Sequence, residues 1–258
     1  MTGMNRFLIK RLNFRDCAAM PNAAGTTIMP GRLYRAGSLD HLSRNEKQVI
    51  TGLHIATAID LRSPREQSSR PCAVPGMRRM TLPFDIHRTV KKRIAPFLFR
   101  RNGAERIHDV VAQVYREIPL LCGSLLDDLF TVLEKRESYP VCIHCSAGKD
   151  RTGYAAAILS CMAGVSFRDI RADYLLSNDS ILPRVRAVTR PLGRISFGLI
   201  PVRTWESALT VYGDYLEAAF DTIEKEFGSV GDYLRSCGIT EARQMTVRAY
   251  LCSPLQPV

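Results

Sequence analysis

The stretch from residue 141 to residue 162 constrains the fold more than any other part of the chain. Its first residues, VCIH, are typical of a buried strand, and the alanine-rich residues 152–162 favour a helix. Between them stand the small residues Ser146, Ala147 and Gly148, which let a backbone loop approach a ligand closely. Backbone N–H groups at the start of such a helix form a site for an anion. The stretch therefore predicts an α/β fold that carries an anion-binding loop.

The rest of the chain repeats the alternation of strands and helices. Residues 55–61 predict a buried parallel strand, and Ser43 with Glu46 forms an S-x-x-E capping box at the start of a short helix. No repeat, low-complexity tract or linker interrupts this pattern. We therefore expect residues 1–258 to form a single α/β domain.

Three later segments carry weaker signals. Residues 87–103 are basic and interrupted by a proline, which suggests an excursion over the surface. Residues 179–203 are expected to be irregular, with arginines scattered among apolar residues. Residues 205–227 are expected to form one long amphipathic helix.

Two cysteines in the predicted strand and loop raise the question of a metal or redox site. Cys142 and Cys145 form a C-x-x-C pair, a spacing found in zinc sites and redox dithiols. Zinc would need a second pair of ligands, and the sequence has no other C-x-x-C or closely spaced Cys and His pair. We therefore expect no metal, and we interpret Cys142 as a small buried residue.

The alternative pattern is Cys-x5-Arg, which pairs Cys145 with Arg151. The pattern is weak by itself, because it also occurs at Cys72 and Cys237. The Cys72 match contains a proline, which lacks an N–H donor, and the Cys237 match contains a glutamate, which would repel an anion. Only Cys145 lies between an apolar strand and a helix, so it is the candidate nucleophile.

The residues around Cys145 suit nucleophilic attack on a phosphate ester. Helix N-termini and nearby cations lower the pKa of a thiol, ordinarily about 8.5, and so favour the reactive thiolate. Arg151 presents a planar fork that can bind two phosphate oxygens at once. Thr152 can donate its hydroxyl to the sulfur of Cys145. His144 either orders the loop backbone or is an ordinary core histidine.

The segment HCSAGKDRTG, residues 144–153, resembles the active-site signature of the cysteine-dependent tyrosine phosphatases. It is most similar to the signature of bacterial members with dual or lipid-and-protein specificity. The similarity extends to NFRD, GRLYRAG, IDLRS, DYLLSN and the C-terminal helices, and so covers nearly the whole chain. It implies a tyrosine-phosphatase-like fold, with a central, mostly parallel sheet flanked by helices, and a cysteinyl-phosphate intermediate without a metal cofactor. Residues 179–205 fall where some members of this subfamily carry a helical lid, so the arginines of this segment either cover the site, meet acidic lipid or form a solvated helical face.

The resemblance assigns roles to the loop residues. Cys145 attacks a phosphate monoester, and Arg151 with the loop residues Ser146, Ala147 and Gly148 binds the phosphate. The expected substrates are phosphotyrosine proteins, with phosphoserine, phosphothreonine and phosphoinositides as further classes. A catalytically silent phosphate-binding module of the same fold is the alternative.

Two aspartates compete for the role of proton donor to the leaving group. Asp85 follows a predicted strand, as the acid does in related phosphatases with a separate acid loop. Asp150 corresponds to the loop aspartate of the subfamily that the chain resembles. Lys149, Arg151 and the helix start favour the ionised form of Asp150 in the empty enzyme, and a bound dianion opposes this effect. We prefer Asp150 and leave Asp85 open.

Three further charged residues, Lys149, Asp60 and Arg62, each have two possible roles. Lys149 either adds positive charge for multiply phosphorylated substrates or is a solvated loop lysine. Asp60 and Arg62 end a strand that should neighbour the Cys145 strand. They either orient the loop for substrate binding or form a structural ion pair.

The net charge of +11 and the pI near 9.5 favour encounter with anionic partners. Phosphorylated substrates and peripheral contact with anionic lipid both fit this charge. A nucleic-acid partner is not expected, since no DNA-reading element or aromatic-basic motif occurs. Eight cysteines at irregular spacing and no Sec signal at the N-terminus indicate a cytoplasmic protein, with export by another route left open.

Overall fold

The computed structural model describes residues 8–18, 28–72, 74, 76–100, 102–196 and 201–253. Its centre is a five-stranded sheet of order β1-β2-β5-β3-β4, in which only β1 runs antiparallel to its neighbour. The strands are β1 (Arg15–Asp16), β2 (Leu33–Ala36), β3 (Thr57–Asp60), β4 (Arg78–Thr81) and β5 (Val141–His144). The expected mostly parallel sheet is therefore confirmed.

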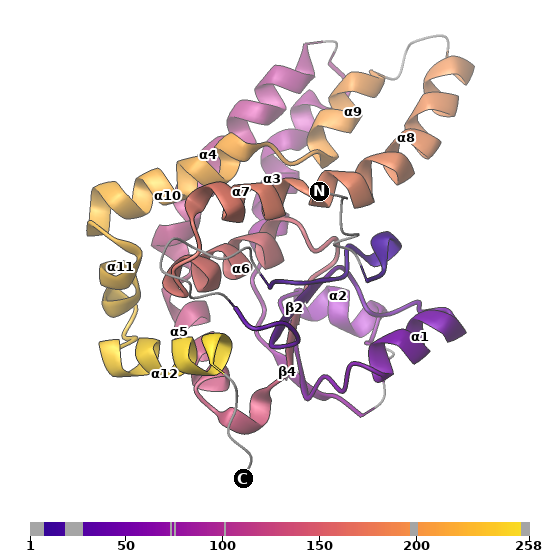
Figure 1. Ribbon diagram of the computed structural model, residues 1–258. Coiled ribbons are helices and arrows are strands. Elements are labelled where there is room, and N and C mark those ends of the chain that lie inside the picture. Colours follow the sequence, from indigo (N-terminus) through magenta and orange to yellow (C-terminus); the bar gives the residue numbers. More distant parts are fainter. Residues whose placement is uncertain are drawn as a thin grey trace, which may run out of the picture.

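Helices cover both faces of this sheet (Figure 1). The α-helices are α1 (Arg44–Thr51), α2 (Pro64–Ser69), α3 (Ile86–Ile94), α4 (Gly103–Leu121), α5 (Gly123–Leu133), α6 (Asp150–Met162), α7 (Phe167–Leu175), α8 (Ser177–Ile195), α9 (Val202–Leu209), α10 (Gly213–Phe227), α11 (Val230–Ser236) and α12 (Glu241–Cys252). The predicted capping box at Ser43 and Glu46 starts α1. Of the described helices, none has both the length and the apolar character that a membrane crossing requires.

The alternation of side chains along β5 divides the buried residues between two cores. Ile143 joins the larger core, which α4, α5, α6 and α10 supply, and Cys142 joins a smaller core that includes Ile50 of α1. Because β5 lies between β2 and β3, its carboxyl end opens at the middle of the sheet edge. Open parallel sheets bind ligands at this edge, so the fold places the Cys145 loop where a ligand is expected.

Two expectations for the second half of the chain were wrong. Residues 179–203 are mostly helical, because α8 continues through Pro183 and Pro191 and packs against α9. The expected single helix over residues 205–227 is broken between α9 and α10. There the side-chain amide of Asn178 accepts from the N–H of Val211 at 2.9 Å and donates to its carbonyl at 2.8 Å. These bonds satisfy an extended backbone, which competes with a continuous helix.

Candidate active site

The loop between β5 and α6 wraps around the sulfur of Cys145. The N–H of Gly148 points at this sulfur from 3.3 Å. Gly148 has a φ of +69°, and a Cβ at this position would come within 2.6 Å of the backbone of Ala36 and Gly37. Only glycine fits this place, so the sequence allows the loop to close tightly over the neighbouring strand β2.

Arg151 lies in the first turn of α6, with its guanidinium held at the base of the loop. Its Nη1 donates to the carbonyl of Leu61 at 3.2 Å and to Oε2 of Glu66 at 2.8 Å. Its Nη2 donates to Oε1 of Glu66 at 3.1 Å and to the hydroxyl of Ser146 at 3.3 Å. This arrangement fixes the guanidinium beside the nucleophile in a defined orientation.

Glu66 is a site residue that the sequence reasoning missed. Burial raises the pKa of its carboxyl, but hydrogen bonds from Arg151 and Ser146 outweigh burial and hold the pKa well below the ordinary value. The same carboxylate accepts from the N–H of Ser63 at 2.9 Å and so completes a capping box at the start of α2. The S-P-R-E spacing after a strand could have revealed this helix start. It could not have revealed the contact between Glu66 and Arg151.

Two side chains hold the outer side of the loop. The amide of Asn13 donates to the carbonyls of Ala147 and Gly148 at 3.2 and 3.0 Å. Nη2 of Arg35 donates to the carbonyl of Gly148 at 2.9 Å. With its carbonyls bound on this side, the loop can turn N–H groups toward the sulfur and toward a bound anion.

Asp173 of α7 binds the arginines behind the loop. Its carboxylate accepts from Arg15 at 2.8 Å and from Arg35 at 2.6 Å, and both guanidinium groups are buried. Ser177, at the start of α8, accepts from Asn13 at 3.2 Å. The segments NFRD, GRLYRAG and DYLLSN, which carry the family resemblance, thus meet in one polar network that supports the loop.

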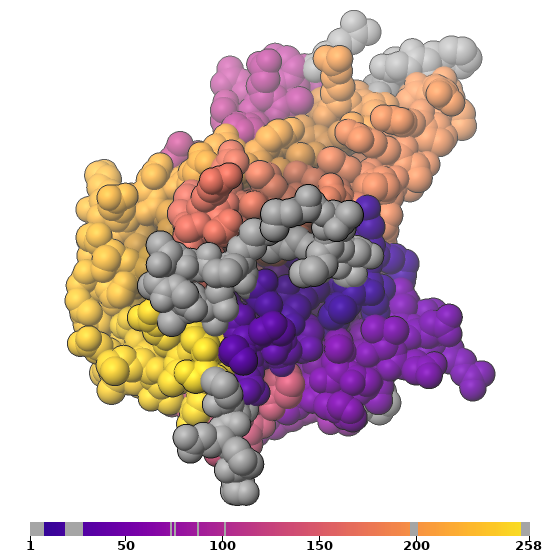
Figure 2. All heavy atoms as spheres, in the orientation of Figure 1, coloured from indigo at the N-terminus to yellow at the C-terminus, as the bar shows by residue number. Residues whose placement is uncertain are grey.

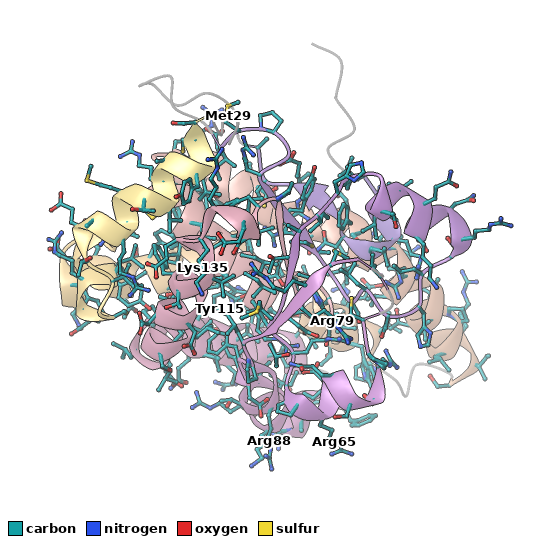
Figure 3. The ribbon with its side chains drawn as sticks, turned by 90° about the horizontal axis from the view of Figure 1, so that it is seen from below. Met29, Arg65, Arg79, Arg88, Tyr115 and Lys135 are labelled. Atoms are coloured by element: carbon teal, nitrogen blue, oxygen red, sulfur yellow. The ribbon has the colours of Figure 1, made fainter. Side chains whose placement is uncertain are left out.

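Asp150 projects from the start of α6 and is oriented by a buried tyrosine pair. The hydroxyl of Tyr115 donates to Oδ1 of Asp150 at 2.8 Å and lies 2.7 Å from the hydroxyl of Tyr174. Tyr115 lies inside the body of the molecule (Figure 3), and burial together with the charge of Asp150 raises the pKa of its phenol. Nζ of Lys149 lies 3.7 Å from Oδ2 of Asp150 and donates to the carbonyl of Leu209 at 3.1 Å. Lys149 therefore links the loop to the end of α9.

Asp60 pairs with Arg62 and does not line the cavity in front of the Cys145 loop. Oδ2 of Asp60 accepts from Nη2 of Arg62 at 2.7 Å in a buried ion pair. Nη1 of Arg62 donates to the hydroxyl of Ser38 at 3.0 Å, and the N–H of Ser38 donates to the carbonyl of Ser146 at 3.1 Å. Ser38 thus connects the ion pair to the loop through hydrogen bonds. Asp60 and Arg62 can therefore form a structural ion pair and orient the loop at the same time.

His144 and Thr152 are both fully buried. Neither ring nitrogen of His144 finds a hydrogen-bond partner among the described residues, and Nδ1 lies 3.9 Å from Oδ1 of Asp60. Burial lowers the pKa of His144 to about 4. The hydroxyl of Thr152 likewise has no partner within the described part of the chain, so the expected bond to the Cys145 sulfur is not formed in this structure.

A cavity of about 450 Å³ lies in front of the loop. Its base is formed by Cys145, Ser146, Ala147, Lys149, Asp150 and Arg151. Its walls are mostly apolar and come chiefly from α3 and α9, including Ile86, Val90, Ile94, Trp205 and Leu209, and Lys91 of α3 adds a cation to them. The segment expected to be a surface excursion therefore contains a cavity wall. Cys145 is only 2% exposed, and the cavity gives access to it.

Asp85, the second candidate acid, occupies a different position. It is exposed, precedes α3 and makes no side-chain capping bond. Its neighbour Ile86 lines the cavity, and Asp85 itself is not among the residues of the cavity wall. Of the two candidates, the structure brings Asp150 together with Cys145 and Arg151.

Fold and site together define a cysteine-dependent phosphatase, with a thiol that faces the N–H of Gly148 in the loop and an arginine beside it. Comparison with known proteins gives the family: the sequence model of the tyrosine phosphatase family matches residues 8–253. The chain belongs to this family and is a protein-tyrosine phosphatase.

Curated relatives agree with this assignment. The triple specificity protein phosphatase PtpB of Mycobacterium tuberculosis is 34% identical over 275 residues, which cover 93% of this chain and 96% of the relative. A putative tyrosine-protein phosphatase of Cupriavidus necator is 27% identical, over 90% of this chain and 84% of its own. Among solved structures, the catalytic domain of the PP-IP phosphatase SIW14 of S. cerevisiae is 13% identical, with a TM-score of 0.33 over 62% of this chain and 78% of its own.

Proposed function

We propose that this phosphatase hydrolyses phosphotyrosine in proteins through a phosphocysteine formed on Cys145. The observation that carries the proposal is the position of the Cys145 sulfur, which faces the N–H of Gly148 beside Arg151 at the base of the cavity. The thiolate attacks phosphorus and forms the S–P bond while the bond to the leaving oxygen breaks. Water then attacks phosphorus, and the thiolate leaves. Arg151 and the loop N–H groups stabilise charge on the equatorial oxygens in both steps.

The experiment replaces Cys145 with serine. Cys145→Ser is expected to abolish turnover of a chromogenic phosphomonoester and to keep the binding of phosphate. A Cys145→Ser variant with full activity would refute the mechanism. A wild-type protein that binds phosphate without turning over any phosphomonoester would instead favour the silent module.

We assign proton donation to Asp150, because Asp150 lines the cavity and Tyr115 fixes its carboxylate. Loss of the acid should slow esters with poor leaving groups far more than an ester that needs no protonation. The test compares Asp150→Asn with Asp85→Asn on a phosphotyrosine peptide and on a nitrophenyl phosphate. Greater sensitivity of Asp85→Asn to the leaving group would transfer the role to Asp85.

The substrate range is proposed to include phosphoserine, phosphothreonine and phosphoinositides. The relative from M. tuberculosis is named for triple specificity. Lys149 adds a cation to the cavity base of this chain, where a second phosphate group could bind it in place of the Leu209 carbonyl. Measuring kcat/KM for a phosphopeptide and for a monophosphorylated inositide decides between protein and lipid preference. An inositide substrate would bring the enzyme into contact with anionic lipid.

The lid at residues 179–205 stays a prediction. It is supported by Trp205, the last residue of this segment, which forms part of the cavity wall. If the lid closes over the substrate, shortening the α8–α9 pair should change KM for a large phosphoprotein more than for a small phosphomonoester.

A further inference from the structure

Helix α8 exposes an apolar stripe that no described element covers. Val188, Leu192 and Ile195 are 61%, 45% and 75% exposed, and their spacing of four and three residues puts them on one face. Thr189, which follows Val188 along the helix, is buried, and α8 packs against α9. Figure 2 shows α8 along the upper right rim of the molecule with its outer side uncovered. Three such side chains in a row on one rim are unusual for a monomeric surface.

Arginines accompany this stripe along the helix. Arg186, Arg190 and Arg194 form a second row at intervals of four residues on a different face of α8 from the stripe, and Arg184, four residues before Val188, lies on the same face as the stripe. Glu206 of α9 lies 3.6 Å from Arg186 and 4.0 Å from Arg190, and so partly neutralises these two. Arg184 and Arg194 have no acidic partner within the described residues. The exposed side of α8 is thus apolar and cationic at once, as in helices that lie in a bilayer interface.

The stripe is connected to the catalytic loop. A groove of about 520 Å³ is lined by Val188 at one side and by Ser146 and Ala147 at the other. Trp205 and Leu209 line both this groove and the catalytic cavity. A group that approaches from the side of α8 therefore meets the catalytic loop without crossing the body of the protein.

We propose that α8 docks on a bilayer that contains anionic lipids. Leu192, Ile195 and Val188 enter the boundary between headgroups and acyl chains, and the arginines bind lipid phosphates. Charge complementarity favours this occupant over an apolar protein groove, because Arg184 and Arg194, which have no acidic partner within the described residues, would remain unpaired against an apolar partner. The inference rests on the proposed function, because docking on a bilayer would serve an enzyme that removes phosphate from lipid headgroups.

The experiment measures sedimentation of the Cys145→Ser protein with phosphatidylcholine vesicles, with and without phosphatidylserine. No phosphoinositide is present, so binding reports the docking surface and not the catalytic loop. We expect binding only to the vesicles with phosphatidylserine and weaker binding at high salt. Equal binding to both vesicles, or no binding to either, would overturn the proposal.

Two pairs of substitutions test the apolar stripe. Leu192→Glu with Ile195→Glu should weaken vesicle binding by at least about tenfold, because it removes apolar contact and adds negative charge. The control is Leu121→Glu with Met245→Glu, which changes side chains that are 71% and 64% exposed on α4 and α12. In Figure 1, α12 lies at the opposite end of the molecule from α8. The control should bind within about twofold of the parent protein. Equal losses for both pairs would contradict docking through α8.

A charge-matched comparison covers the case in which the glutamate variants do not fold. Arg190→Gln with Arg194→Gln should weaken binding by about 25-fold, or roughly fivefold per arginine. Arg116→Gln with Arg248→Gln removes the same net charge from exposed positions on α4 and α12 and should have a much smaller effect. If both pairs weaken binding equally, the attraction is diffuse and α8 is not the docking site.

The same variants with Cys145 restored separate this inference from the proposed function. Each should turn over a soluble chromogenic phosphomonoester at the wild-type rate, since none of the altered residues contacts the catalytic loop. Loss of vesicle binding with intact turnover supports docking through α8. Vesicle binding by a protein without any turnover would refute the proposed function and leave the docking surface in place.

Discussion

The carboxylate of Glu66 both holds Arg151 and caps α2. Glu66→Gln weakens both contacts, and a control variant that loses only a helix cap separates the two effects. The carboxylate lies 2.8 and 3.1 Å from the two Nη atoms of Arg151 and 2.9 Å from the N–H of Ser63. Its side chain is 26% exposed. Glutamine has nearly the same shape and keeps one oxygen acceptor, but its NH2 group would face the guanidinium.

The expected cost follows from these contacts. A hydrogen bond to a charged group contributes about 1.5–3 kcal/mol, and partial exposure of Glu66 places the loss near about 2 kcal/mol. If this loss falls on the position of Arg151 in the transition state, kcat/KM decreases by about 30-fold. The weakened cap should lower the free energy of unfolding by about 1 kcal/mol at most, which corresponds to a decrease in Tm of about 2–4 °C.

The control is Glu46→Gln at the start of α1. Glu46 also completes a capping box, and it holds Arg11 at 2.8 and 2.6 Å on the surface. Its substitution should lower Tm by a similar amount and keep kcat/KM within about twofold of wild type. The assays are turnover of a nitrophenyl phosphate and thermal unfolding of both variants. If Glu66→Gln and Glu46→Gln are equally active, the loop positions Arg151 without Glu66 and the reasoning fails.

Three further predictions concern residues around the loop. Gly148→Ala should reduce kcat by at least about 100-fold, since its Cβ would meet the backbone of Ala36 at 2.6 Å, and kinetics on a chromogenic ester measure this. Tyr115→Phe should reduce kcat by about tenfold with little change in KM, because it removes the hydroxyl that orients Asp150; a normal kcat would contradict this. The pKa of His144 is about 4 when folded against 6.5 ordinarily, so the unfolded chain binds the proton first and stability falls as pH decreases from 6.5 to 4. The loss at pH 5 is about 2 kcal/mol, and urea unfolding should show it in wild type and not in His144→Gln.

The residues that carry the chemistry could be predicted because they are contiguous in the sequence. Cys145, the small loop residues and Arg151 lie within one strand-loop-helix unit, whose geometry follows from local preferences. Glu66 and Asp173 could not be assigned in this way. Each contacts the site through tertiary packing, and the spacing of residues within a single segment does not report which loop another helix will face.

Tertiary contacts also explain two wrong predictions of secondary structure: α8 is continuous, and the chain breaks between α9 and α10. Residues 179–203, with arginines scattered among apolar residues, were expected to be irregular, and residues 205–227 had the periodicity of one helix. The α8–α9 packing offsets the hydrogen bonds lost at the prolines, and the amide of Asn178 satisfies the backbone of Val211 outside any helix. In both cases a contact made at long range outweighs a local preference.

The choice between the two aspartates illustrates what these long-range contacts contribute to function. In the sequence, each aspartate stands near a helix start beside a strand, and only the family resemblance favoured Asp150. Tyr115 comes from α4, and its hydroxyl directs the Asp150 carboxylate, while the Lys149 ammonium is drawn to the end of α9 by the carbonyl of Leu209. An acid must be fixed within reach of the leaving oxygen before its protonation matters. The helices that build the cavity therefore support our proposal that Asp150 is the acid, because Asp150 lines the cavity and Asp85 does not.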